Sequence, residues 1–311
     1  MATPTTCSQT PLSDTTRGVK TLALAIALAA CSSSAPPPAA PKPAPAPFTP
    51  TAFSVKVSGT GRPVIFIPGL ASPGSVWDGT VAHLGGKVQA HVLTLAGFAG
   101  QPPIAAPFLQ QVHDQLEQYI DANHLDHPVI IGHSLGGVMS LWMGETDPQL
   151  GGIVDVDGLP FLAAMMDPSM TSDKAMQGAA GVRDQMLKAP HDAFVENMKQ
   201  FIGSMATRPE DVAMLDDAAA KSDQTTVANA FAELMGKDLR ADLAKIQVPA
   251  MVIAAGEMGR VMPDQLTAGW HAQVDAIPRV DLEIVDHAKH YVMLDQPEAF
   301  YALIDKALAT K

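Results

Sequence analysis

Residues 129–137, Val-Ile-Ile-Gly-His-Ser-Leu-Gly-Gly, constrain the fold of this chain more than any other stretch. An apolar, strand-like run leads directly into a Gly-x-Ser-x-Gly turn, and residues 135–145 continue as a helix-forming run. Gly132 and Gly136 permit a turn so tight that Ser134 takes strained backbone angles. Such a turn lifts the serine hydroxyl above the end of a sheet. The stretch therefore predicts a strand, turn and helix of an α/β fold that presents Ser134 in a pocket.

Strand-like and helix-like patterns alternate along the rest of the chain. Apolar runs typical of strands lie at 53–57, 64–67, 88–95, 129–132, 153–156, 250–255 and 282–285. Helical spacing of apolar residues is found at 81–84, 109–120, 135–144, 265–274 and 298–308. Strands that are apolar throughout and alternate with helices indicate a mostly parallel sheet with helices on both faces.

One long interval, residues 159–246, breaks this alternation. It has helical patterns and no convincing strand, so it predicts an inserted helical lid. The interval is rich in methionine, with Met165, Met166, Met176, Met186, Met198 and Met205. Flexible methionine side chains can line an adaptable apolar pocket, and at helical spacing they can equally belong to a core.

Residues 1–31 are typical of an export signal. Arg17 and Lys20 supply a positive region, and the apolar run 21–30 is shorter than the roughly 20 residues of a membrane-spanning helix. The run ends in Leu-Ala-Ala-Cys, which resembles a bacterial lipobox. The resemblance implies cleavage before Cys31 and lipid attachment to that cysteine.

Residues 32–50 consist almost entirely of Ser, Ala and Pro, which predicts a disordered tether ahead of a single domain over 51–311. The lipobox resemblance implies a protein anchored by its lipid in the bacterial cell envelope. Ser32, where retained inner-membrane lipoproteins carry Asp, favours the outer membrane and a domain facing the periplasm. Cys7 would leave with the signal, so no disulfide is expected in the folded domain.

Composition and charge exclude some classes of function. The formal net charge of −12 argues against binding to nucleic acid phosphates. The chain has no His-Glu-x-x-His or paired-cysteine spacing, and the pair His124 and His127 falls in a predicted turn. We therefore expect neither a metal nor a cofactor.

A serine nucleophile needs a base, and the best candidate is His290. It lies after the last predicted strand in residues 288–298, Ala-Lys-His-Tyr-Val-Met-Leu-Asp-Gln-Pro-Glu. This segment resembles the α/β-hydrolase superfamily, in which a histidine at this point precedes an apolar stretch and an acidic residue two before proline, here Asp295. His287, three residues upstream, is the competing base. His133, inside the turn, is expected to be structural.

The resemblance also implies an oxyanion hole made of two backbone amides. One is that of Leu135, directly after the serine. The other lies in residues 67–77, which are similar to the His-Gly loop of the superfamily with Pro68 in place of the histidine. Leu70, after the glycine of that loop, is the expected second donor.

The position of the acid is ambiguous. The superfamily pattern Gly-x-x-Asp-x-x-x-Pro falls on residues 256–263, where Gly259 replaces the aspartate. The acid is then either Glu257 or Asp157, which follows the predicted strand at 153–156. We favour Asp157 and keep Glu257 as the alternative. Asp155 is a weaker third candidate that shares a strand face with Asp157 and could orient it.

The order Ser134, Asp157, His290 along the chain is that of the superfamily. The resemblance implies a serine hydrolase that cleaves a small to medium hydrophobic carboxylic ester through an acyl-enzyme. Lactonase, amidase, thioesterase, carbon–carbon hydrolase and perhydrolase activities use the same residues, so they remain alternatives. A non-catalytic envelope lipoprotein that binds a ligand is a further alternative, suggested by Gly259.

Overall fold

The computed structural model describes residues 48–257 and 263–310. The predicted signal with Cys31, nearly all of the predicted tether, and Gly259 lie outside these residues. Within the described ranges, no helix combines the length and the apolar character that crossing a bilayer requires.

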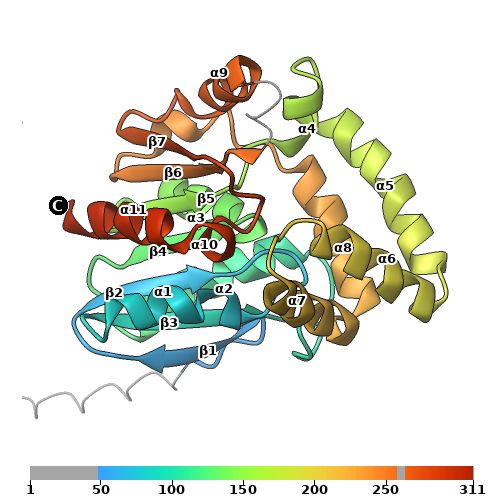
Figure 1. The fold of residues 1–311 in the computed structure, drawn as a ribbon, viewed down its shortest axis with the longest axis horizontal. Coiled ribbons are helices and arrows are strands. Elements are labelled where there is room, and N and C mark those ends of the chain that lie inside the picture. Colours follow the sequence, from blue (N-terminus) through green and yellow to red (C-terminus); the bar gives the residue numbers. More distant parts are fainter. Residues whose placement is uncertain (1–47, 258–262, 311) are drawn as a thin grey trace, which may run out of the picture. The chain divides into compact units, whose positions relative to one another are not determined.

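A seven-stranded sheet forms the centre of the domain (Figure 1). Its order is β1-β3-β2-β4-β5-β6-β7, with β1 antiparallel to β3 and all other neighbouring strands parallel. The strands are β1 (Phe53–Ser58), β2 (Arg62–Ile67), β3 (Val88–Leu95), β4 (Val129–His133), β5 (Gly152–Val156), β6 (Ala250–Ala255) and β7 (Val280–Val285). All seven predicted strands and the mostly parallel sheet are confirmed.

The two central strands β4 and β5 are buried at every residue. This explains why both read as continuous apolar runs, since parallel strands covered on both faces meet no solvent. Gly132 of β4 pairs with Asp155 of β5, and β2 places Ile67 opposite Gly132. The carboxyl ends of these parallel strands therefore lie together at one edge of the sheet.

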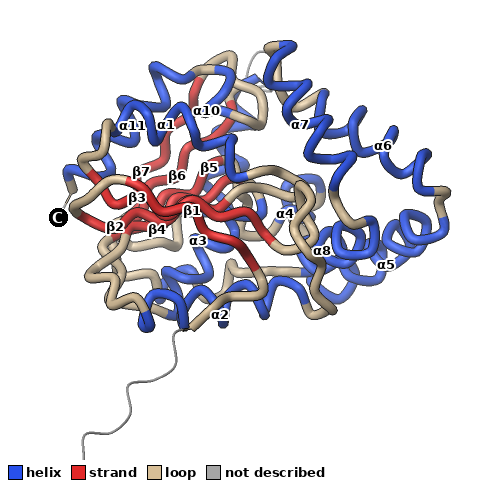
Figure 2. Tube along the Cα trace, turned by 90° about the horizontal axis from the view of Figure 1, so that it is seen from below, coloured by secondary structure: helices blue, strands red, loops and turns tan. Residues whose placement is uncertain are grey.

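Helices cover both faces of the sheet (Figure 2). Helices α1 (Asp78–Leu84) and α11 (Pro297–Ala309) lie on one face, and α2 (Phe108–Ala122) and α3 (Leu135–Thr146) lie on the other. Helix α9 (Pro263–Val274) packs beside β7. The five predicted helices of the core are confirmed.

Trp77, in the short 3-10 helix Gly74–Trp77, packs between α11 and the sheet. Its ring lies 5.5 Å from that of Phe66 on β2 and 6.2 Å from that of Phe300 on α11. All three side chains are fully buried, and burial of such rings is among the largest apolar contributions to a core.

Between β5 and β6 the chain forms the helical insertion, residues 159–246. Its helices are α4 (Leu162–Met166), α5 (Ser172–Lys188), α6 (His191–Gly203), α7 (Pro209–Lys221), α8 (Gln224–Gly236) and the 3-10 helix Leu243–Lys245. Local signals start several of them: the Asp223 side chain accepts from the Thr226 amide at 2.7 Å, and Pro209 opens α7. No residue of 159–246 is in a strand. The insertion lies beyond the carboxyl edge of the sheet (Figure 1).

Candidate active site

Ser134 occupies the sharp turn between β4 and α3. Its backbone has φ 56° and ψ −116°, and its amide donates to the Val156 carbonyl at 2.8 Å. A Cβ atom on Gly132 would lie 1.8 Å from the Gly136 carbonyl oxygen, and one on Gly136 would lie 2.2 Å from that of Ile67. Both positions therefore require glycine, and the predicted strained turn is confirmed.

Asp157 follows the end of β5 and is held by two elements. Its backbone has φ 55°, and its amide donates to the Ile253 carbonyl at 2.9 Å. Its Oδ1 atom accepts from the Ala255 amide of β6 at 2.8 Å, and its Oδ2 atom accepts from His290 Nδ1 at 2.6 Å. Both carboxylate oxygens are thus fixed, which fixes the ring that Oδ2 contacts.

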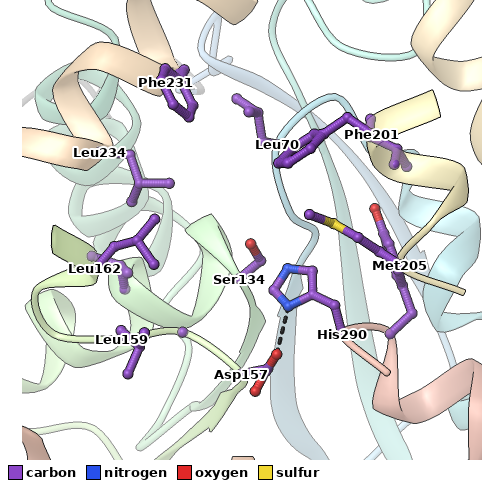
Figure 3. A pocket seen from close by; sticks show the side chains of 14 residues that line it. Leu70, Ser134, Asp157, Leu159, Leu162, Phe201, Met205, Phe231, Leu234 and His290 are labelled. Carbon is purple, nitrogen blue, oxygen red and sulfur yellow. Dashed lines mark hydrogen bonds and ion pairs between the residues drawn. The ribbon is translucent and has the colours of Figure 1, made fainter. Parts of the chain in front are cut away.

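The three predicted catalytic residues meet in one cavity. Ser134, Asp157 and His290 line it together, with the imidazole between the other two side chains (Figure 3). The alternative acid Glu257 does not line this cavity, and its amide donates to the Ala288 carbonyl at 2.9 Å. His287 is exposed and does not line the cavity either.

Asp155 has a different place from the one we expected. Its side chain is fully buried beneath the turn, and its Oδ1 atom accepts from the Gly158 amide at 2.8 Å. Burial raises the pKa of this carboxyl well above its usual range, and the nearby Asp157 adds to the rise. The contacts that orient Asp157 come from Ala255 and His290, so the idea that Asp155 orients it is not supported. The reason is that Asp157 leaves the strand with a positive φ and no longer follows its two-residue period.

His133 packs under the loop that carries His290. Its Nε2 atom donates to the His290 carbonyl at 3.0 Å, and its ring lies 4.5 Å from that of Tyr291. Burial lowers the pKa of His133 well below its usual range, and the neighbouring His290 lowers it further, so the ring is neutral. His133 thus supports the segment that carries His290, residues 288–298, which we call the histidine loop. His133 does not line the cavity.

The two predicted oxyanion donors are Leu135, which directly follows the serine, and Leu70, which lines the same cavity. Leu135 is the first residue of α3, where amides have no partner within the helix. Neither amide donates to another described residue. The amino end of α3 adds a partial positive charge at the same point.

A buried pair of hydroxyls that the sequence did not reveal supports the loop of Leu70. Ser72 Oγ donates to the Leu70 carbonyl at 3.2 Å and lies 2.9 Å from Tyr291 Oη, which leaves Tyr291 as the donor in the second bond. Burial raises the pKa of Tyr291 to about 12, so its hydroxyl keeps the proton. The available signal was position alone: Tyr291 follows the candidate base, and Ser72 lies two residues after the candidate donor.

The helical insertion is bonded to the histidine loop. Asp295 Oδ1 accepts from the Thr207 amide at 2.9 Å, and Oδ2 accepts from Thr207 Oγ1 at 3.0 Å and from the Lys289 amide at 2.9 Å. The Tyr291 amide also donates to the Met205 carbonyl at 3.3 Å. The acidic residue two before proline thus ties the segment between α6 and α7 to the loop of His290.

The cavity has a volume of about 380 Å³ and is mainly apolar. Besides the three polar side chains it is lined by Leu70, Val138, Gly158, Leu159, Leu162, Phe201, Ile202, Met205, Phe231, Leu234 and Tyr291. Among the predicted lid methionines, Met205 reaches it (Figure 3). The site therefore combines a hydroxyl, an imidazole and a carboxylate with a surface suited to an apolar molecule.

Elsewhere in the described residues, His113, Asp114 and Glu117 of α2 offer ligand atoms within 4.8 Å of one another. The geometry is explained by packing, because His113 Nε2 lies 3.0 Å from Thr146 Oγ1 and its ring stacks on Trp142 at 4.2 Å. The cluster joins α2 to α3.

A family model described as "Alpha/beta hydrolase family" matches residues 64–303. The chain belongs to the α/β-hydrolase family. The match includes the strained serine turn, the strand that precedes Asp157 and the histidine loop. Hydrolysis is the type of reaction that the family supports.

Curated relatives of this α/β hydrolase carry the names of different hydrolases. The chain is 24% identical over 257 residues to the pimeloyl-[acyl-carrier protein] methyl ester esterase of Vibrio atlanticus (strain LGP32), covering 78% of this chain and 93% of the relative. It is 22% identical over 249 residues to 3-oxoadipate enol-lactonase 1 of Acinetobacter baylyi (strain ATCC 33305 / BD413 / ADP1), covering 79% and 89%.

Among solved structures, a thermophilic esterase from Thermogutta terrifontis superposes on this α/β hydrolase with a TM-score of 0.68. The superposition covers 82% of this chain and 92% of the esterase at 18% sequence identity. At that identity the likeness shows the fold alone, which is the predicted one.

Proposed function

We propose that this α/β hydrolase cleaves hydrophobic carboxylic esters through an acyl-enzyme on Ser134. The observation that carries the proposal is the hydrogen bond from His290 Nδ1 to Asp157, made beside Ser134 in an apolar cavity. A serine hydroxyl becomes a competent nucleophile when an oriented imidazole accepts its proton.

In the first half of the reaction, Ser134 Oγ forms a bond to the ester carbonyl carbon and its proton passes to His290 Nε2. The carbonyl oxygen becomes an oxyanion, which the Leu70 and Leu135 amides bind. Asp157 stabilises the resulting imidazolium. The tetrahedral intermediate then breaks its bond to the alcohol oxygen, which takes the proton from His290, and the acyl group stays on Ser134.

In the second half, water attacks the acyl carbon and gives a proton to His290 Nε2. The bond from the acyl carbon to Ser134 Oγ breaks, Oγ recovers the proton, and the carboxylic acid leaves. This cycle consumes one ester and one water and restores the enzyme, so the reaction needs no redox partner.

The size and lining of the cavity favour a small to medium hydrophobic group at the ester. Its volume of about 380 Å³ is at the lower end of ligand pockets, and its polar atoms gather at the serine. Lactones are the second candidate, because one curated relative is named an enol-lactonase and ring opening uses the same three residues.

A panel of p-nitrophenyl esters from acetate to palmitate, with an enol-lactone beside them, tests the function. We expect turnover of at least one ester by the wild type and a loss of roughly 10³-fold or more in Ser134→Ala. A fluorophosphonate should label the wild type and not this variant. A folded wild-type protein that neither turns over the panel nor takes the label would contradict the proposal.

We also propose that the protein is exported and anchored in the bacterial envelope, facing the periplasm, by lipid on Cys31. The support is the lipobox-like Leu-Ala-Ala-Cys after an apolar run. Growth with radiolabelled palmitate should label the wild type and leave Cys31→Ser unlabelled. An equally labelled Cys31→Ser protein would exclude this anchor.

A further inference from the structure

A second apolar compartment lies next to the candidate active site. It has a volume of about 340 Å³ and is lined by parts of α5, α6 and α8 of the helical insertion together with Leu70. Neither the proposed reaction nor the packing of the sheet uses this compartment.

The compartment adjoins the catalytic cavity. Leu70, Phe201 and Phe231 line both, so these three side chains form the boundary between them. Figure 3 shows Leu70, Phe201 and Phe231 on the side of the catalytic cavity that lies away from Asp157. Phe201 is 49% exposed, so part of its ring is free to contact a ligand.

One face of α6 runs through both spaces. Phe194 and Met198 line the second compartment, Phe201 lines both, and Ile202 lines the catalytic cavity. These residues have the spacing of a single helix face, and eight residues of α-helix extend roughly 12 Å. The face is therefore a continuous apolar wall that leads away from Ser134.

We propose that the second compartment binds the distal part of a long acyl chain whose ester carbonyl lies at Ser134. This inference rests on the proposed function and extends its substrates to fatty acyl esters too long for the catalytic cavity. Phe194 and Met198 form a buried apolar floor, which suits methylene groups. Gln185 and Asn197 are exposed and form a polar rim, so the end of a longer chain can reach solvent there.

A substitution that places a large side chain at the exposed side of the compartment tests the proposal. Val182 is 43% exposed and lines the compartment, so Val182→Trp adds bulk there with little risk to folding. Val57 on β1 is 50% exposed and lies outside both spaces, which makes Val57→Trp the matched control.

The readout is the ratio of kcat/KM for p-nitrophenyl laurate to that for p-nitrophenyl butyrate. We expect Val182→Trp to lower this ratio roughly tenfold, because the extra methylene groups of laurate lose their apolar surface. Val57→Trp should keep the wild-type ratio. An unchanged ratio in Val182→Trp, or an equal fall in both variants, would overturn the proposal. A stronger effect on lauryl acetate than on the laurate ester would also overturn it, since the alcohol would then occupy the compartment.

Direct binding separates this inference from the proposed function. Laurate should displace a dansyl-labelled fatty acid from Ser134→Ala, and adding Val182→Trp should weaken laurate binding roughly tenfold. If the wild type hydrolyses no ester but Val182→Trp still weakens laurate binding, acyl-chain binding in the compartment is supported and the proposed function is wrong. If laurate binds equally with and without Val182→Trp, the compartment is excluded whatever the activity.

Discussion

The Nδ1 atom of His290 lies 2.6 Å from Oδ2 of Asp157, while Oδ1 of the same carboxylate accepts a hydrogen bond from the Ala255 amide. The end of β5 therefore positions the Asp157 carboxylate, and β6 holds it independently of its contact with the His290 ring. The side chains of His290 and Asp157 are 23% and 15% exposed, so solvent weakens their interaction little.

Asp157→Asn should lower kcat for a good ester by roughly 10³ to 10⁴-fold, since an amide favours the wrong imidazole tautomer. Glu257→Gln should change it by no more than about twofold, because Glu257 does not line the cavity. Steady-state kinetics on one ester compares the two variants. A large loss in Glu257→Gln with little change in Asp157→Asn would reverse the assignment of the acid.

Gly136→Ala should abolish the soluble protein or destabilise it by about 3 kcal/mol or more, because the new methyl group meets the Ile67 carbonyl. Gly178→Ala is the control: it lies inside α5, and a Cβ there meets nothing within 4 Å. That change should stabilise the protein by about 0.5 to 1 kcal/mol. Urea unfolding measures both, and a stable Gly136→Ala protein would contradict the tight-turn geometry.

Tyr291→Phe removes the hydroxyl that supports Ser72 and the loop of Leu70. We expect a fall in kcat of roughly fivefold, equivalent to about 1 kcal/mol of lost transition-state stabilisation. Tyr301→Phe changes a partly buried tyrosine on α11 that stacks on His83 and should leave kcat unaltered. Equal kinetics for both variants would show that the hydroxyl pair does not position the oxyanion loop.

Asp295→Ala removes two hydrogen bonds between the histidine loop and Thr207 of the helical insertion, and one within the loop, from the Lys289 amide. The expected cost is about 1.5 to 3 kcal/mol of unfolding free energy, with faster proteolysis between α6 and α7. Asp305→Ala, which removes a surface partner of His83, should cost less than about 0.5 kcal/mol. Limited proteolysis followed by mass spectrometry locates the cut, and unchanged protection of residues 203–208 would contradict this role of Asp295.

Glu145 of α3 gives the stability a specific pH dependence. Burial raises the pKa of Glu145 from 4.5 to about 7, with a further rise from Asp242 and opposition from Lys237 and Lys245. The folded protein thus holds a proton that the unfolded chain releases, so this carboxyl makes stability fall as pH rises from about 4.5 to about 7.

Glu145→Gln removes that part of the pH dependence because the amide does not titrate. Between about pH 5 and pH 8 the unfolding free energy of the variant should improve relative to wild type by about 1 to 2 kcal/mol, after allowance for partial exposure. Urea unfolding at several pH values measures the difference. Parallel pH profiles for the two proteins would show that Glu145 is not perturbed.

The helical insertion shows how far sequence patterns reach. Residues 159–246 show helical spacing of apolar residues and no strand pattern, which predicted a block of helices. This prediction is possible because an amphipathic helix places its apolar residues at a regular spacing in the sequence. The cavities that these helices enclose could not be predicted. Phe201 and Phe231 both line the boundary of two compartments only because the fold places α6 and α8 around the same cavity.

The sequence by itself determined where the strands lie along the chain and the strained turn at Ser134. Both are local: apolar spacing reports burial, and only glycine fits positions 132 and 136, where a Cβ would strike the backbone. It also favoured Asp157 as the acid and left Glu257 and Asp155 as alternatives. Tertiary structure alone decided that Asp157 meets His290 and that Tyr291 meets Ser72, since these partners are 133 and 219 residues apart. No local pattern encodes such contacts, because they exist only once the parallel strands bring their carboxyl ends to one edge.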